Sequence, residues 1–126
     1  MPTILVADDD EGIRDIFQIL LGNEGYVLDI KSNGEDLLAD NFSLPDLFLI
    51  DKQLSGISGL DVCRHLKSMP HTRDIPLIMV SASPDIATLS KEAGADEYIE
   101  KPFDINYLLR MIKEHLQKQQ VSGIVT

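Results

Sequence analysis

The chain has 126 residues, enough for one domain with a core of its own. Its 11 basic and 21 acidic residues give a net charge of −10, so we expect it to repel DNA and anionic membranes. No apolar run approaches the roughly 20 residues of a membrane span, and the start does not resemble a secretory leader. The single cysteine, Cys63, excludes an internal disulfide, and we expect a cytoplasmic protein.

Short apolar runs alternate along the chain with stretches in which apolar residues recur at helical spacing. The runs are rich in branched side chains and predict strands, and the second pattern predicts amphipathic helices. Strands are expected at 3–7, 26–31, 46–50, 76–82 and 97–100. The first helix is expected at 11–22 and the third at 60–69. Between them, a short helix is expected to begin at a cap, Ser32 or Asn33, and to run through Leu38. The fourth helix is expected to run from Ser83-Pro84 to Gly94, and the last from a cap at Asp104 to Leu116.

This alternation predicts parallel strands, because every connection contains a helix. The strand sequences are continuously apolar, which indicates a sheet covered on both faces. We therefore expect an α/β fold, a doubly wound (βα)5 sandwich with a five-stranded parallel sheet in the order 2-1-3-4-5. An eight-fold barrel would need more units. Residues 1–118 would form the domain, and residues 119–126 a flexible tail or linker remnant.

Polar side chains stand at the carboxyl ends of four predicted strands, where open α/β sheets bind ligands. They are Asp8 and Asp9 after the first strand, Asp51 after the third, Ser81 at the end of the fourth and Lys101 after the fifth. Each has an ordinary explanation on its own, since acids favour helix starts, serines occur in turns and lysines are usually solvated. Their coincidence at one edge favours a functional site.

Carboxylates that converge on one crevice repel each other, and a divalent cation relieves that repulsion. Oxygen ligands suit Mg²⁺, and the scattered histidines do not indicate zinc. Mg²⁺ held by carboxylates is typical of phosphate chemistry, in which an aspartate can itself be the nucleophile. Asp51 is the best candidate, because it stands alone at the end of a buried strand. Ser81 and Lys101 could contact the phosphoryl oxygens.

The segments ILVADDDEGIR, LIMVSA and AGADEYIEKPF resemble the receiver domain of two-component response regulators, the CheY-like family with a flavodoxin-like fold, over about residues 3–117. By this resemblance Asp8 and Asp9 bind the metal and Asp51 is the phosphoacceptor. The resemblance further implies the backbone carbonyl of Gln53 as a Mg²⁺ ligand, the Ser81 hydroxyl as phosphoryl sensor, Lys101 on the phosphate, a cis peptide before Pro102, and Tyr98 as an aromatic switch.

The resemblance also implies partners. A histidine kinase or histidine phosphotransfer protein would donate the phosphoryl group, and a surface at about 84–116 would report it to a downstream output protein or domain. The chain would be no enzyme beyond its own phosphorylation and dephosphorylation. It departs from the family at Ser55, where proline is frequent, so we expect a looser loop before Gly59. Lys52 is also unusual and has no assigned role. Gln53 and Ser83 occupy positions that tune dephosphorylation in the family.

Three alternatives stay open. A Mg²⁺-dependent phosphohydrolase with an aspartyl nucleophile would typically carry a second acid two residues on, where this chain has Gln53. A flavodoxin-like electron carrier would need a Ser/Thr/Gly-rich phosphate loop after the first strand, where this chain has acids. A degenerate receiver would act only in protein docking, against which the complete set of acids, Ser81 and Lys101 argues.

Overall fold

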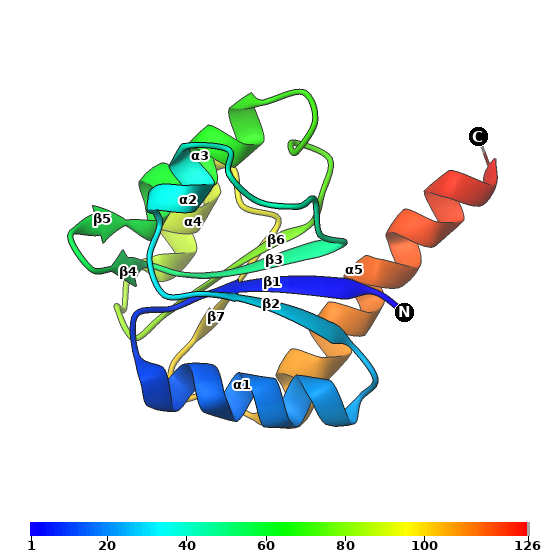
Figure 1. The fold of residues 1–126 in the computed structure, drawn as a ribbon, viewed down its shortest axis with the longest axis horizontal. Coiled ribbons are helices and arrows are strands. Elements are labelled where there is room, and N and C mark those ends of the chain that lie inside the picture. Colours follow the sequence, from blue (N-terminus) through cyan, green and yellow to red (C-terminus); the bar gives the residue numbers. More distant parts are fainter. Residues whose placement is uncertain (126) are drawn as a thin grey trace.

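A computed structural model describes the backbone of residues 1–125 and the side chains of residues 1–118. Its central sheet has five parallel strands in the order β2-β1-β3-β6-β7 (Figure 1). This order confirms the predicted 2-1-3-4-5 arrangement, in which the chain winds first to one edge and then to the other. The strands are β1 (Thr3–Ala7), β2 (Val27–Lys31), β3 (Leu47–Asp51), β6 (Leu77–Ser81) and β7 (Glu97–Glu100).

Helices cover both faces of this sheet (Figure 1). The helices α1 (Glu11–Asn23) and α5 (Ile105–Val125) lie on one face. The other face carries α2 (Glu35–Leu38), α3 (Gly59–Ser68) and α4 (Ile86–Ala93). None of the helices in the described part of the chain combines the length and apolar character of a membrane span.

Each face has its own hydrophobic core, and the alternation of side chains along the strands divides them. In β3, Leu47 and Leu49 pack toward α1 and α5, whereas Phe48 and Ile50 pack toward α3 and α4. The strand is buried along its whole length, which explains its continuously apolar sequence. β2 lies at the edge of the sheet and is partly exposed, which explains its more polar residues.

A short hairpin follows β3 where a loose loop was predicted. Its strands β4 (Gln53–Leu54) and β5 (Ile57–Ser58) pair antiparallel. The two turn residues have positive φ, 29° at Ser55 and 85° at Gly56, as a tight two-residue hairpin turn requires. Proline fixes φ near −65°, so the family's frequent proline could not adopt this geometry at position 55. The segment is therefore paired, and whether it is looser than in the family stays a prediction.

The start of α4 also differs from the prediction. The helix begins at Ile86 after a turn at residues 84–85, and its N-cap Asp85 makes no side-chain capping bond. Ser83, the predicted cap, instead bonds to Ser81 and Lys52 through its N–H and hydroxyl. The helix ends at Gly94 with φ 89°, as predicted.

The last helix extends beyond the predicted end at Leu116. Asp104 caps it as predicted, since its Oδ1 accepts hydrogen bonds from the N–H groups of Asn106 at 2.8 Å and Tyr107 at 3.3 Å. The backbone is helical as far as Val125, through most of the range 119–126 that was predicted as a flexible tail. The side chains of 119–125 and all of Thr126 lie outside the described residues, so the division into domain and tail stays a prediction.

Candidate functional site

The carboxyl ends of four strands meet on the side of the molecule where the β4–β5 hairpin lies (Figure 1). Parallel pairing sets Ala7 beside Ile50, Asp51 beside Val80, and Ser81 beside Glu100. The residues that follow these positions therefore share one edge, as the sequence predicts. Asp8, Asp51 and Ser81 are buried there, and Lys101 is half-buried.

Asp51 is held at this edge by both of its carboxylate oxygens. Its Oδ1 accepts a hydrogen bond from the Gln53 N–H at 2.8 Å, and its Oδ2 accepts one from the Lys101 ammonium at 2.5 Å. Its side chain is only 9% exposed. Asp51 is thus fixed in orientation by a rigid strand and two donors, with the lysine as its direct charge partner.

Asp8 lies next to this ion pair. Its Oδ1 accepts from the Asp10 N–H at 2.9 Å, and its Oδ2 lies 3.5 Å from the Lys101 ammonium. Within the described part of the chain this buried Oδ2 has no hydrogen-bond partner. Burial raises the pKa of Asp8 to about 6, and the charge of Asp51 adds to the rise, although the Asp10 N–H and Lys101 oppose it.

Lys101 balances the two acids. Burial tends to lower its pKa, but the hydrogen bond and charge of Asp51, together with the charge of Asp8, raise it overall. The Lys101 ammonium is therefore the charge partner of both acids. The peptide bond between Lys101 and Pro102 is cis, as the resemblance implies.

Asp9 does not join the other two acids. It is exposed, and its Oδ2 accepts a hydrogen bond from the Ser55 N–H at 3.3 Å. Among the described residues, no three acidic, histidine or cysteine side chains are arranged to hold an ion. The predicted convergence of three carboxylates is thus realised for Asp8 and Asp51 only.

The donor set nevertheless fits Mg²⁺. The unpartnered Oδ2 of Asp8 and the Oδ2 of Asp51 both lie within reach of one ammonium. Mg²⁺ keeps several of its waters and is usually bound through one or two protein carboxylates, so a pair of acids is compatible with its coordination.

One contact at this edge was not predicted. The Lys52 ammonium donates a hydrogen bond to the Ser83 hydroxyl at 3.1 Å, and the Ser83 N–H donates to the Ser81 hydroxyl oxygen at 2.9 Å. Lys52 therefore bridges the ends of β3 and β6, and its side chain is only partly exposed. The sequence held one signal for this contact: the predicted strands three and four are neighbours, so Lys52 and Ser83, which follow them, lie on neighbouring loops.

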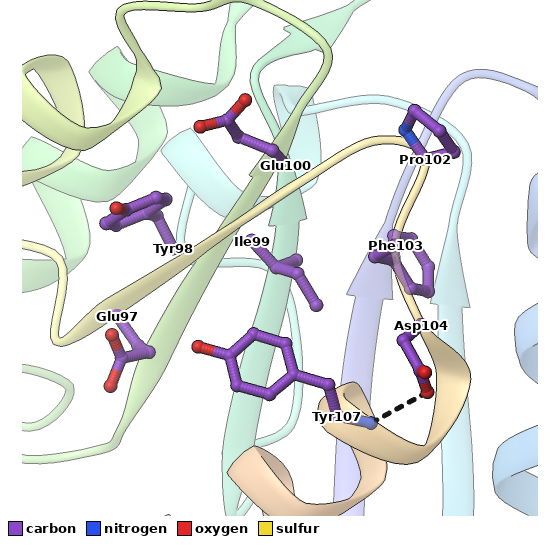
Figure 2. Close-up of a pocket in the computed structure, with 8 residues that line it drawn as sticks. All are labelled: Glu97, Tyr98, Ile99, Glu100, Pro102, Phe103, Asp104 and Tyr107. Carbon is purple, nitrogen blue, oxygen red and sulfur yellow. Dashed lines mark hydrogen bonds between the residues drawn. The ribbon is translucent and has the colours of Figure 1, made fainter.

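Tyr98 lies away from the acids, in the middle of β7. It is half-buried and packs against the core under α3 and α4, whereas its neighbour Ile99 belongs to the core under α1 and α5. Figure 2 shows the two side chains on different sides of the strand. They line a pocket of about 340 Å³ that β7 forms with the start of α5, which contributes the exposed Tyr107.

The fold and this edge define a class of protein: a doubly wound sheet that presents a buried aspartate, a second acid, a hydroxyl and a lysine at its carboxyl ends. The model of the response regulator receiver domain matches residues 4–113, and the chain belongs to this family. It is thus a receiver domain of two-component signal transduction, a signalling module and not a classical enzyme.

Known proteins resemble it over nearly all of its length. The response regulator ArlR of Staphylococcus epidermidis is 36% identical over 99% of this chain, and the phosphate regulon regulatory protein PhoB of Rhizobium meliloti is 31% identical over 100%. This chain spans 60% and 57% of their lengths. The crystal structure of a CheY-like receiver domain protein from Methanospirillum hungatei superposes with a TM-score of 0.86 at 32% identity, covering 98% of this chain and 99% of that one.

Proposed function

We propose that Asp51 accepts a phosphoryl group from the phosphohistidine of a histidine kinase or histidine phosphotransfer protein. The observation that carries this is the fixed carboxylate of Asp51, at the open edge of the sheet, with Lys101 on its Oδ2 and Asp8 beside it. An oxygen of Asp51 attacks phosphorus, the new O–P bond forms, and the P–N bond breaks with its electron pair leaving on the imidazole. Water later hydrolyses the aspartyl phosphate and releases inorganic phosphate.

We assign Mg²⁺ binding to Asp8 and Asp51, with Asp9 and the backbone carbonyl of Gln53 as further ligands. The unpartnered buried oxygen of Asp8 supports this assignment. When bound, Mg²⁺ offsets negative charge on the transferring group. Asp9 accepts the Ser55 N–H through Oδ2, so we assign its other carboxylate oxygen to the ion.

Lys101 and Ser81 stabilise the phosphorylated state in this proposal. The Lys101 ammonium, already on Asp51, is placed to pair with a phosphoryl oxygen. The Ser81 hydroxyl moves toward the phosphoryl group, and Tyr98 turns inward into the space it leaves. The surface formed by α4, β7 and α5, about residues 84–116, then reports the change to a downstream output protein or domain.

The setting of this function is a further part of the proposal. We place the domain in the cytoplasm, where histidine kinases present their phosphohistidine. The net charge of −10 argues against DNA binding by the domain itself. Any DNA-binding output therefore resides in another domain or protein.

Phosphorylation by acetyl phosphate tests the proposal. The protein should gain one phosphoryl group in a Mg²⁺-dependent reaction, detected by intact-mass spectrometry, and Asp51→Asn should abolish the gain. The matched control is Asp61→Asn, since Asp61 is exposed on α3 and pairs only with the exposed Arg64 in the described residues. Equal labelling of Asp51→Asn would refute the assignment. Steady turnover of small phosphate esters would instead identify a phosphohydrolase.

A further inference from the structure

Lys52 is fixed beside the acceptor through its backbone. Its N–H donates to the Val80 carbonyl at 2.9 Å, and its carbonyl accepts from the Gly59 N–H at 2.6 Å. These two bonds tie the residue after Asp51 to β6 on one side and to the start of α3 on the other. The direction in which the Lys52 side chain leaves the backbone is therefore set by the fold.

The side chain is held as well. Lys52 is half-buried, and its ammonium donates to the Ser83 hydroxyl at 3.1 Å across the gap between two loops. Within the residues that the structure describes, it pairs with no carboxylate, although the chain carries 21 acidic residues. Holding a lysine side chain in one conformation costs rotamer entropy. Because the partner of Lys52 is a neutral hydroxyl, attraction between opposite charges does not explain its position, and the hydrogen bond to Ser83 does.

Ser83 transmits this placement to Ser81. The Ser83 N–H donates to the Ser81 hydroxyl oxygen at 2.9 Å. A serine hydroxyl has one hydrogen and two acceptor sites, and the Ser83 N–H fills one of the acceptor sites. The hydrogen of Ser81 is thus left for another acceptor, and at this edge the acceptor would be a phosphoryl oxygen on Asp51.

From these contacts we infer that Lys52 is a positioning residue for the phosphoryl site: it holds Ser83, and the Ser83 N–H on the Ser81 hydroxyl oxygen keeps the hydroxyl hydrogen free for a phosphoryl oxygen when Ser81 moves toward it. The inference rests on the proposed function of Asp51. It assigns a role to the one residue of the edge that the resemblance to receiver domains leaves unexplained. Lys52 itself touches no reacting atom in this role.

Binding of beryllofluoride with Mg²⁺, followed by NMR titration, tests the inference without a phosphodonor. Lys52→Met keeps the apolar stem and removes the ammonium, and it should weaken binding roughly fivefold, the equivalent of one hydrogen bond. Lys52→Arg should retain most of the affinity, since a guanidinium can reach the same hydroxyl. Lys118→Met, at an exposed site on α5 outside residues 84–116, makes the same charge change and should bind like the wild type. Thermal melts of all variants check that they fold.

A double-mutant cycle separates action through Ser83 from a general charge effect. Ser83→Ala removes the hydroxyl that Lys52 binds, and it should weaken binding as much as Lys52→Met does. The double variant should be no weaker than either single variant. Additive losses, unchanged affinity of Lys52→Met or tighter binding would each overturn the inference. If the wild type itself shows no binding that depends on Asp51, the proposed function fails instead.

Discussion

Asp8 is nearly fully buried and has one carboxylate oxygen without a hydrogen-bond partner among the described residues. Burial, reinforced by the charge of Asp51, raises its pKa from 3.8 to about 6. A residue that prefers its neutral form in the folded state destabilises the fold when it is ionised. Ionised Asp8 thus lowers the stability of the fold, and we expect a bound cation to offset this loss.

We expect the free energy of unfolding of the metal-free protein to fall as pH rises from about 4 through about 6. Over this range the folded state holds a proton on Asp8 that the unfolded state has released, so the stabilisation is complete below pH 3.8 and lost above about 6. Asp8→Asn should remove this contribution and stabilise the protein by about 3 kcal/mol near neutral pH. Urea unfolding in EDTA at several pH values measures it. Parallel pH curves for the two proteins would contradict the prediction.

The hairpin β4–β5 and the start of α3 form the element that closes over the backbone of Asp51. A Cβ added at Gly59 would lie 1.9 Å from the Asp51 carbonyl oxygen, so no other residue fits without displacing α3 or β3. The Gly59 N–H donates to the Lys52 carbonyl at 2.6 Å in this close approach. Glycine here lets the helix pack directly on the strand end that carries the acceptor.

Gly59→Ala should therefore destabilise the protein by about 2–3 kcal/mol, because backbone atoms and not a flexible side chain must move. It should also lower the rate of labelling by acetyl phosphate, since Asp51 shifts with its carbonyl. Gly22→Ala is the control: Gly22 is exposed in α1, its added Cβ meets nothing within 4 Å, and alanine should stabilise the helix by about 0.5–1 kcal/mol. Chemical denaturation of both variants checks the contrast. Equal changes in the free energy of unfolding for the two substitutions would show that the close approach at Gly59 does not restrict this position.

The whole molecule is two cores separated by one sheet, and β7 belongs to both. Tyr98 packs into the core under α3 and α4, while Ile99 packs into the core under α1 and α5. The strand leads from these residues directly to Lys101 at the site. We therefore expect a change in the position of Lys101 or Ser81 to alter the packing around β7, because close-packed cores do not absorb displacement locally.

We expect beryllofluoride with Mg²⁺ to shift backbone NMR signals of Tyr98 and of the adjoining parts of α4 and α5, besides those at the edge of the sheet. Asp51→Asn should abolish both sets of shifts, which makes it the control. Tyr98→Phe should still bind the ion with little change in affinity, since Tyr98 lies outside the acid site. Shifts confined to the edge would show that the site is not coupled to this surface.

Much of the architecture follows from local sequence patterns. Continuously apolar runs such as Leu47–Ile50 mark buried parallel strands, and helical spacing between them requires crossovers on both faces. The parallel order then brings the strand ends to one edge, which is why the sequence alone groups Asp8, Asp51, Ser81 and Lys101. These inferences hold because residue spacing and chain direction determine them, and neither depends on exact distances.

The tertiary structure alone decided which atoms meet at that edge. Asp9 bonds to Ser55 on the hairpin, and Lys52 bonds to Ser83 on the next loop. The elevated pKa of Asp8 likewise follows from its burial, which no pattern of neighbours in the sequence reports. Hydrogen bonds and desolvation change over fractions of an ångström, whereas sequence spacing locates a residue only to a strand end or a loop. The sequence by itself therefore determined the edge and grouped Asp8 with Asp51, and the packed chain determined that Asp9 lies apart and how each side chain is used there.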